Sequence, residues 1–533
     1  MVTMRTFSLL AALTLAFLRT LMTSCAADLR PAALFSDHMV LQQSTSAPIW
    51  GWSDPGAKVS ASFISSSSVN RNHVLTAAAI AGADGKWTLN IATPPAGGPY
   101  SLMISDGKDK VTVSDILVGE VWLASGQSNM DFTVSNDKKT FAGVQNMDQE
   151  IAAANYPQIR FFTVDLKLAD QPQQDVTGHW EVCSPQTVGE FSAVAYFFAR
   201  DLYQDRKTPF GIIDSTWGAS SAQCWISRQA LVADHQTKPL VDQYETLIAT
   251  WTPDKAQADY QAALTKWQSD RAAAAASGGR APRKPGAPKD PHQDQHNPYL
   301  LYNGMIDPVK PYAIRGVIWY QGESNGPTAN IYGDIMTTLI ADWRNAWENP
   351  KLPFFQVQLA FCNKALAEPV HASSQPAKIR FAQFVTSTTI PNAGMATAVD
   401  IGDAVSIHPK NKQEVGRRLA LVAQNQVYGE ADVEDSGPAY ESASVEGSSM
   451  RIKFSHIGGG LVLKDITPNG FAISGDGKSW QYGDAKIDGD TIVVSSAQVL
   501  QPTAVRYAWG DNPPISLYNK AGLPASPFKT DAN

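Results

Sequence analysis

Cysteine is scarce in this sequence, and the usual metal-binding motifs do not occur in it. Only 4 of the 533 residues are cysteine, and neither a Cys-x-x-Cys pair nor a His-Glu-x-x-His motif is present. A chain of this size does not need a disulfide framework, so we expect at most one bridge among Cys183, Cys224 and Cys362. These residues give no support to a zinc site.

An excess of positive charge is also missing. The 43 Lys and Arg residues are outnumbered by 50 Asp and Glu residues, which leaves a net charge of −7. A nucleic-acid binder would need a basic face, so we expect no nucleic-acid partner. The hydrophobic fraction of 44% and the charged fraction of 17% are ordinary, and they exclude a disordered or collagen-like chain.

Long apolar runs are missing beyond the N-terminus. At the N-terminus itself, Arg5 precedes an apolar run at Phe7–Leu18 and small residues at Ser24–Ala27. This order is typical of a secretory signal, so we expect residues 1–27 to be removed from a secreted or periplasmic protein. A lipid-modified Cys25 is the alternative. No other stretch is long and apolar enough to cross a bilayer, and we expect no membrane span.

Short alternating runs separated by turns occur at both ends of the remaining sequence. Residues 28–115 contain alternating runs such as Lys58–Phe63 and Tyr100–Ile104, and residues 431–533 contain similar runs on either side of Gly458–Gly460. This spacing is typical of antiparallel strands. We predict an N-terminal β-sandwich-like domain over 28–115 and a C-terminal β domain over 431–533.

Between these regions the pattern changes to buried strands that alternate with amphipathic helices. Apolar runs of strand length lie at Val121–Ala124, Gly211–Ile213, Gly316–Tyr320, Phe354–Leu359 and Ala396–Val399. A capping box at Thr187 and Glu190 predicts the start of one helix, and another helical pattern follows Pro409. We predict an α/β domain over 116–430, with a parallel sheet covered by helices on both faces. Residues 230–298 contain a helical pattern and several prolines, which we interpret as a surface insertion.

Polar segments follow four of these strands, at the edge where parallel sheets bind their ligands. In the first segment Ser128 follows a turn of small residues, where backbone N–H groups can hold a negative oxygen beside the hydroxyl. In the second segment Gly218 would let a backbone N–H approach a ligand closely. Each segment taken alone is better explained as a polar turn.

The third and fourth segments supply amides, an acid and an imidazole. Gln321 and Asn325 can donate amide N–H bonds to an oxyanion, while Glu323 either holds neighbouring groups or is a surface charge. His408 lies just before a helix, where its ring could act as the base for a serine. A lone histidine is more often structural, but this one ends the last strand–loop–helix unit.

The four segments together resemble the SGNH hydrolase superfamily and, within it, the sialate O-acetylesterase-type carbohydrate esterases. The resemblance runs from Leu34–Gln42 to Leu517–Pro524, and it is especially close at Tyr302–Met305 and Gly316–Asn325. It implies an SGNH-hydrolase-like sheet as the catalytic domain, flanked by the two β modules.

By this likeness Ser128 is the nucleophile and His408 is the base of a serine carboxylic-ester hydrolase. The N–H groups of Ser128 and Gly218 would form an oxyanion hole together with a side-chain amide. Gln321 is the favoured source of that amide, and Asn325 is the alternative.

One departure from the superfamily concerns the acid that orients the catalytic histidine. Many members carry it two or three residues earlier, where this sequence has Ser406 and Val405. Asp403 lies five residues before His408 and could turn back to its ring. Alternatively, a backbone carbonyl orients the imidazole of a Ser–His dyad.

The resemblance implies an enzyme that removes acetyl esters from sugars through an acyl-enzyme, without a metal or an organic cofactor. O-acetylated sialic acid is the substrate that the family suggests, and acetylated xylan or xyloglucan is the alternative. A non-catalytic carbohydrate-binding protein is the alternative outside the enzymes, supported only by the missing acid. The expected partner is an O-acetylated sugar or glycan, and the oligomeric state stays open.

Overall fold

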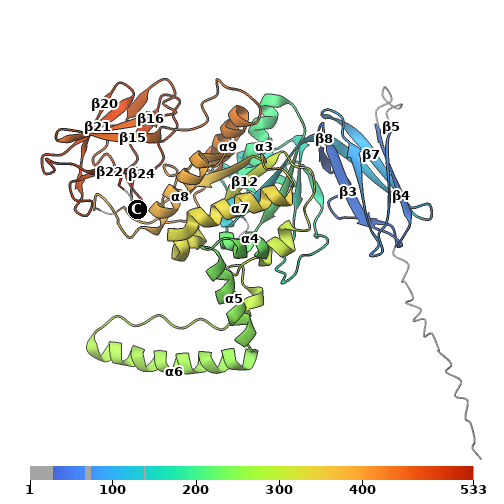
Figure 1. Ribbon diagram of the computed structural model, residues 1–533, viewed down its shortest axis with the longest axis horizontal. Coiled ribbons are helices and arrows are strands. Elements are labelled where there is room, and N and C mark those ends of the chain that lie inside the picture. Colours follow the sequence, from blue (N-terminus) through green and yellow to red (C-terminus); the bar gives the residue numbers. More distant parts are fainter. Residues whose placement is uncertain (1–27, 66–73, 137–139, 366, 532–533) are drawn as a thin grey trace, which may run out of the picture.

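The structure is a computed structural model that describes residues 28–65, 74–136, 140–365 and 367–531. The expected signal segment, with Cys25, lies outside the described residues. Figure 1 shows three regions side by side: N-terminal β-strands, a central sheet with helices, and C-terminal β-strands. Among the helices of the described ranges, none combines the length and the apolar character needed to cross a membrane.

Antiparallel strands build the N-terminal region, as its alternating sequence predicts. One sheet consists of β1 (Arg30–Pro31), β3 (Ser46–Trp52) and β6 (Lys86–Ala92). A second consists of β4 (Lys58–Ser65), β5 (Val74–Ile80), β7 (Gly97–Ser105) and the first half of β8 (Lys110–Gly126). Buried and exposed residues alternate along β4 and β6, since one face of each sheet contributes to the core. The short β2 (Val40–Gln42) pairs in parallel with β8.

Strand β8 continues from the N-terminal region into the central sheet. Its first half pairs antiparallel with β7, and its second half lies between β11 (Phe210–Thr216) and β12 (Gly316–Tyr320), parallel to both. Every residue from Ile116 to Gly126 is buried, because this half is covered on both faces. The expected boundary between residues 115 and 116 therefore falls inside one continuous strand.

The central sheet has the strand order β10–β9–β11–β8–β12–β13–β14. Its remaining strands are β9 (Tyr156–Thr163), β10 (Trp180–Cys183), β13 (Phe354–Gln358) and β14 (Ala393–Thr397). Neighbouring strands run parallel from β9 to β14, as predicted, while the edge strand β10 runs antiparallel to β9. The sheet is therefore mixed, and its β9–β10 edge was not predicted from the sequence.

Helices cover both faces of the central sheet (Figure 1). One face carries α3 (Ala193–Arg206) and α9 (Lys412–Gln426), and the other carries α7 (Tyr332–Ala346) and α8 (Gln375–Thr389). Trp122 of β8 packs against Phe198 of α3. In contrast, Trp319 of β12 packs against Trp343 of α7. The predicted covering of both faces is confirmed by these contacts.

The start of α3 corrects one prediction. The segment at Thr187 does not open the helix, because η1 (Val188–Glu190) is a single 3₁₀ turn and Phe191 is extended. Ser192 caps α3 instead, where its hydroxyl accepts a hydrogen bond from the N–H of Ala195 at 3.3 Å. The extended backbone lets Phe191 stack on Phe161 of β9, with ring centroids 4.2 Å apart. This buried contact outweighs the local capping signal.

The insertion projects away from the central sheet as a helical arm (Figure 1). It contains α5 (Lys238–Thr250) and α6 (Pro253–Ser277), whereas the sequence predicted one helix. No residue of α6 is buried. The other short elements are α1 (Ser128–Asp131), α2 (Met147–Ala153), α4 (Arg228–Ala233), η2 (Ala222–Trp225), η3 (Pro291–Gln293), η4 (Tyr302–Ile306) and η5 (Glu323–Ile331).

The C-terminal region consists of antiparallel strands, as predicted. One sheet contains β15 (Ala439–Glu446), β16 (Ser449–Ser455), β20 (Asp484–Asp488) and β21 (Thr491–Ser495). Another contains β18 (Phe471–Ser474), β19 (Gln481–Tyr482), β22 (Ala504–Tyr507) and β24 (Phe528–Lys529). A separate pair is formed by β17 (Leu461–Leu463) and β23 (Leu517–Asn519). Their buried side chains, among them Ile452, Ile473 and Val494, form a hydrophobic cluster of their own.

Candidate active site

Ser128 and His408 meet at the carboxyl edge of the central sheet, although 280 positions separate them in the sequence. The Nε2 atom of His408 lies 2.8 Å from the Oγ atom of Ser128, within hydrogen-bond distance. Ser128 begins α1 directly after β8 and is 8% exposed. His408 lies in the loop between β14 and α9. Two strand–loop–helix units thus bring a hydroxyl and an imidazole into contact.

The turn that presents Ser128 is held by the third polar segment, which follows β12 and contains Gln321 and Asn325. Gly126 has a φ of 137°, and a Cβ atom there would collide with the carbonyl oxygen of Tyr320 in β12. The backbone N–H of Gln127 donates to that same carbonyl at 3.0 Å. The Oε1 atom of Gln127 accepts the backbone N–H of Gly322 at 3.3 Å and that of Ser324 at 3.2 Å. These bonds lock the end of β8 to the end of β12.

Two backbone N–H groups lie beside the hydroxyl without an acceptor. Neither Ser128 nor Gly218 donates a backbone hydrogen bond to any acceptor within the described ranges. A Cβ atom built on Gly218 would lie 3.7 Å from the Cβ atom of Ser128, so the two segments face each other closely. An oxygen that acquires negative charge at this place could accept from both groups.

The imidazole of His408 is poised to accept a proton. Burial lowers its pKa, and the nearby Lys412 cation lowers the pKa further, so the neutral ring is favoured. The ring of Phe141 contacts it edge-on, with centroids 5.5 Å apart. The Oγ atom of Ser406 accepts the backbone N–H of His408 at 3.1 Å. A neutral ring with a fixed Nε2 atom is the form that a general base requires.

Asp403 does not orient this ring. Its Oδ1 atom accepts the backbone N–H of Val405 at 2.8 Å, and its backbone forms a bridge with Cys362. Throughout the part of the chain that the structure describes, no carboxylate forms a hydrogen bond or ion pair with the His408 ring. The contacts of Asp403 are therefore with its own turn and with the segment after β13.

Asn129, Glu323 and Lys412 form a buried polar group beneath the Ser–His pair. The Nδ2 atom of Asn129 donates to Oε1 of Glu323 at 2.5 Å, and its Oδ1 atom accepts from Nζ of Lys412 at 2.5 Å. Asn129 also donates to the carbonyl oxygen of Ile407 at 3.0 Å, which fixes the loop next to His408. Burial lowers the pKa of Lys412 to about 7, although Glu323 opposes this shift, and burial raises the pKa of Glu323.

The side-chain amides of Gln321 and Asn325 are occupied by contacts within the protein. The Nε2 atom of Gln321 donates to Oδ1 of Asn325 at 2.6 Å and lies 3.1 Å from the Ser220 carbonyl. The Nδ2 atom of Asn325 donates to Gln223 and Thr328, at 2.9 Å each. Gln321 is fully buried and Asn325 is 1% exposed. Neither amide therefore has the free N–H that the expected third oxyanion donor requires, because both are used to join neighbouring loops.

A cavity of about 240 Å³ lies next to this group of residues. Ser128 and His408 do not line it, but Glu323 and Ile407 do, and Asn363, Gln375 and Asp511 add polar groups. Asp511 comes from the C-terminal region, so that region contributes to the surroundings of the site. The Oε2 atom of Glu323 has no hydrogen-bond partner in the described residues.

Metal ligands gather at another place in the molecule. Glu434, Asp435 and His456 have ligand atoms within 4.8 Å of one another. A hydrogen bond to Asp435 and the charges of both acids raise the pKa of His456 to about 9. Ion pairs of His456 with Glu434 and Asp435, at 3.1 and 3.4 Å, account for this cluster without a metal. Cys183, Cys224 and Cys362 are all free thiols.

Asn129 and Lys412 also belong to the site, although they were not predicted from the sequence. The signal for Asn129 was its position directly after Ser128 in the first polar segment. Lys412 lies four residues after His408, at the first position of α9, and it is fully buried. A lysine next to a helix start is usually a solvated charge, so its burial could not be read from the sequence.

Comparison with known proteins finds one family that matches part of the chain. The family described as carbohydrate esterase, sialic acid-specific acetylesterase, matches residues 290–424. This stretch contains Gln321, Asp403 and His408 but not Ser128.

Relatives of known activity and structure match a much larger part of the chain. Sialate O-acetylesterase from Rattus norvegicus is 29% identical over 437 residues, which cover 77% of this chain and 75% of that protein. The Homo sapiens sialate O-acetylesterase is 28% identical over 440 residues, with coverages of 77% and 73%. The crystal structure of XAC1771, a carbohydrate acetylesterase from Xanthomonas citri, is 33% identical. It has a TM-score of 0.75 and covers 95% of this chain and 100% of that chain.

Proposed function

Because the chain belongs to the carbohydrate esterase family of sialic acid-specific acetylesterases, we propose that it removes acetyl groups from sugars through a serine nucleophile, Ser128, and a base, His408. The observation that carries this proposal is the 2.8 Å contact between the two side chains, beside two backbone N–H groups that lack acceptors. A hydroxyl, a neutral imidazole and an oxyanion site are the parts that acyl transfer needs.

In the first half of the reaction His408 accepts the proton of Ser128 at Nε2 while Oγ attacks the acetyl carbonyl carbon. The carbonyl oxygen becomes negative and accepts hydrogen bonds from the N–H groups of Ser128 and Gly218. Each such donor contributes roughly 3–4 kcal/mol to the transition state in comparable sites. His408 then gives its proton to the sugar oxygen, which leaves as a hydroxyl. An acetyl group remains on Ser128.

In the second half water takes the place of the sugar. His408 accepts a proton from the water molecule, and the resulting hydroxide attacks the acetyl carbon of the acyl-enzyme. The tetrahedral intermediate collapses when Ser128 leaves and takes its proton back from His408. Acetate is released, and the residues return to their starting state without any metal or cofactor.

The imidazole works without an acid partner in this proposal. Asn129 fixes the loop at Ile407, and Ser406 holds the backbone of His408. Glu323 supports the site by accepting from Asn129 rather than by touching the ring. We therefore assign a Ser–His dyad, in which Asp403 is not a catalytic group. This arrangement is of the SGNH type in its nucleophile and base.

The sugar and the location of the enzyme follow from the family and from the N-terminus. O-acetylated sialic acid is the substrate that the family description supports. We further propose secretion, supported by the signal-like sequence of residues 1–27. We also propose that the catalytic domain spans 116–430, between β modules at 28–115 and 431–533, with β8 continuing across the first boundary.

Acetate release from a chromogenic acetyl ester tests the mechanism. Ser128→Ala should lower kcat/KM about 10⁴-fold or more, because no other group replaces the nucleophile. Ser373→Ala is the matched control, since Ser373 also lies within hydrogen-bond distance of a histidine. Retained activity in Ser128→Ala, with its melting temperature unchanged, would remove Ser128 from this role.

The substrate is tested on O-acetylated sialosides, acetylated xylan and acetylated xyloglucan. The proposal predicts the highest kcat/KM on the sialosides. Faster acetate release from either plant polysaccharide would replace sialate as the substrate and leave the serine mechanism in place.

A further inference from the structure

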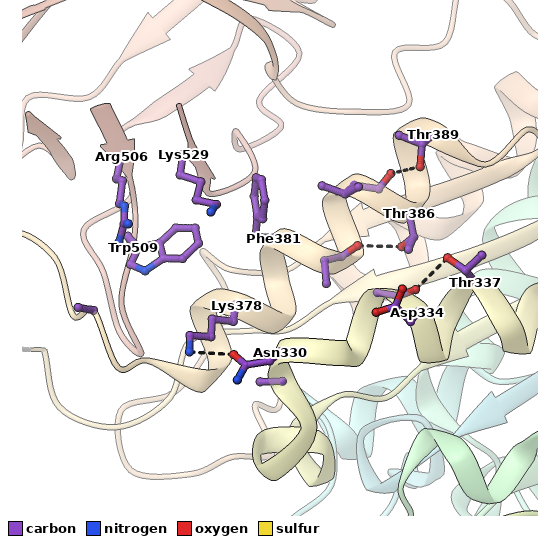
Figure 2. A pocket seen from close by; sticks show the side chains of 15 residues that line it. Asn330, Asp334, Thr337, Lys378, Phe381, Thr386, Thr389, Arg506, Trp509 and Lys529 are labelled. Carbon is purple, nitrogen blue, oxygen red and sulfur yellow. Dashed lines mark hydrogen bonds between the residues drawn. The ribbon is translucent and has the colours of Figure 1, made fainter. Parts of the chain in front are cut away.

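A second cleft, of about 660 Å³, lies between the helices and the C-terminal strands. Residues of η5, α7 and α8 form one side, and residues of β22 and β24 with the loop after β22 form the other (Figure 2). Neither Ser128 nor His408 lines it. Its volume is in the range of small-ligand sites, which often lie where two regions of a protein meet.

Two aromatic rings form apolar surfaces inside this cleft. Phe381 of α8 and Trp509 after β22 are neighbours, with ring centroids 5.8 Å apart and planes tilted by 59°. Trp509 is 6% exposed, and its indole N–H has no hydrogen-bond partner among the described residues. A buried donor without an acceptor costs about 1–3 kcal/mol. A ligand that combines an apolar face with oxygen acceptors fits this environment, and sugar rings have both features.

Cationic side chains dominate the polar part of the cleft. Lys378, Arg506 and Lys529 line it, together with one acid, Asp334 (Figure 2). The Nζ atom of Lys378 contacts Oδ1 of Asn330 at 3.0 Å, which is a neutral partner. Lys378 forms no ion pair with the described residues, whereas Arg506 is paired with Asp531.

Arg506 is held in place by two tryptophan rings and an aspartate. Its guanidinium group lies over Trp480 and Trp509, at 4.7 and 4.9 Å from the ring centroids. Its Nε and Nη2 atoms donate to the two carboxylate oxygens of Asp531 at 3.0 and 2.6 Å. Its Nη1 atom makes no hydrogen bond with the described residues. A planar, preorganised guanidinium with remaining donors suits a carboxylate.

We propose that this cleft is a non-catalytic binding site for an acidic oligosaccharide, in which a sugar carboxylate is held by Lys378 and Arg506 and a sugar ring packs against Phe381 and Trp509. The site goes beyond the esterase function, because none of its residues takes part in acetyl transfer. A neutral glycan would leave the ammonium group of Lys378 with only the neutral side chain of Asn330 as its contact. A purely apolar ligand would leave the indole N–H without one as well.

Calorimetric titration of the full chain with sialyllactose and with lactose tests this proposal. The two probes differ by one acidic sugar, and neither carries an acetyl ester. We expect saturable binding of sialyllactose, with affinity at least about tenfold higher than for lactose, because a charge-assisted hydrogen bond contributes roughly that factor. The affinity should fall as salt is raised.

Two substitutions locate the binding. Lys378→Glu should weaken sialyllactose binding by about tenfold or more, since it replaces attraction with repulsion. The matched control is Lys486→Glu, which makes the same charge change at an exposed position of β20 outside the cleft. Trp509→Phe keeps the ring but removes the indole donor, and it should weaken binding several-fold.

Three results would overturn the proposal: no saturable binding, equal affinity for the two probes, or sialyllactose binding that Lys378→Glu leaves unchanged. The last result would place the ligand elsewhere, for example at Ser128. Hydrolysis of a small acetyl ester should be unchanged in Lys378→Glu. Failure of this binding site is therefore distinguishable from failure of the esterase mechanism.

Discussion

Among the described residues, two serine hydroxyls lie within hydrogen-bond distance of a histidine ring, and the two pairs differ in their surroundings. Ser128 lies 2.8 Å from Nε2 of His408, and Ser373 lies 3.0 Å from Nε2 of His371. The second pair even has an acid, since Oδ1 of Asp511 lies 3.4 Å from Nδ1 of His371. If only the sequence of contacts from acid to histidine to serine is considered, the Ser373 group resembles a complete triad more closely than the Ser128 group does.

The surroundings of the two pairs instead favour Ser128 as the reactive serine. Ser373 is exposed and only two positions from His371, in a turn where the N–H of Ser374 donates to the carbonyl of His371 at 3.0 Å. The contact is therefore a local one. Ser128 instead lies at a strand end beside Gly218, with backbone donors and a buried base of lowered pKa. The comparison teaches that the position in the fold, rather than a carboxylate, distinguishes a reactive pair from a turn.

Replacing each histidine with glutamine should lower activity in one pair and not in the other. His408→Gln removes the base and should lower kcat/KM on a chromogenic acetyl ester by about 10³–10⁴-fold. His371→Gln should change it less than about threefold, because that ring serves no reacting group. Steady-state kinetics at neutral pH measure both. Similar losses in the two variants would contradict the distinction drawn between the pairs.

Gly218→Ala tests the backbone donors that only the Ser128 pair has. The added methyl would lie 3.7 Å from the Cβ atom of Ser128 and would crowd the place of the acetyl group. Ala keeps the backbone N–H, so the loss comes from the methyl group displacing the substrate carbonyl from this donor, and we expect kcat/KM to fall by up to about 10²-fold. Gly286→Ala, where a Cβ meets nothing within 4 Å, is the control for the substitution itself. Full activity in Gly218→Ala would show that this N–H is not near the reacting carbonyl.

Lys412→Met tests whether the buried cation tunes the base of the first pair. Lys412 lowers the pKa of His408, so its removal should raise that pKa. Because the neutral ring is the active form, the acidic limb of the profile of kcat/KM against pH should move to higher pH. Activity below neutrality should then drop several-fold. Lys410→Met, at an exposed position two residues earlier, should leave the limb in place. An unmoved limb in Lys412→Met would contradict the coupling.

Asp403→Asn should lower activity far less than the loss of a triad aspartate would. A true triad aspartate typically accounts for a factor of about 10⁴ in rate, whereas we expect a loss of less than about tenfold here. The side chain contacts the N–H of Val405 rather than the imidazole, so the amide preserves the ring orientation. Measurement of kcat on the acetyl ester shows whether Asp403 acts as a triad acid. A 10⁴-fold loss would mean that Asp403 reaches His408 during the reaction.

The strand ends could be predicted from the sequence because short apolar runs followed by polar residues are local signals. β8, β11 and β12 lie where these runs predicted them, and their parallel pairing brings Ser128 close to Gly218. The start of α3 could not be predicted in the same way, because the long-range stacking of Phe191 on Phe161 overrides the local capping signal.

The polar environment of the site was harder to predict. The amides of Gln321 and Asn325 have the right chemistry for an oxyanion, but their hydrogen-bond partners come from loops about a hundred positions away. The burial of Lys412 likewise depends on Phe132 and Tyr320, whose rings face its amine at 4.7 and 5.3 Å. Such contacts arise only after the sheet has assembled. Residue types and spacing therefore indicate candidates, while their roles depend on tertiary packing.

Covalent labelling with an organofluorophosphonate reagent tests the central claim most directly. Attack by an activated serine forms a phosphorus–oxygen bond, releases fluoride and transfers the serine proton to the base. Peptide mass spectrometry of the labelled protein should find the phosphonyl group on Ser128, at one group per chain, and His408→Gln should abolish it. A label on Ser373, or undiminished labelling of Ser128 in His408→Gln, would contradict the account.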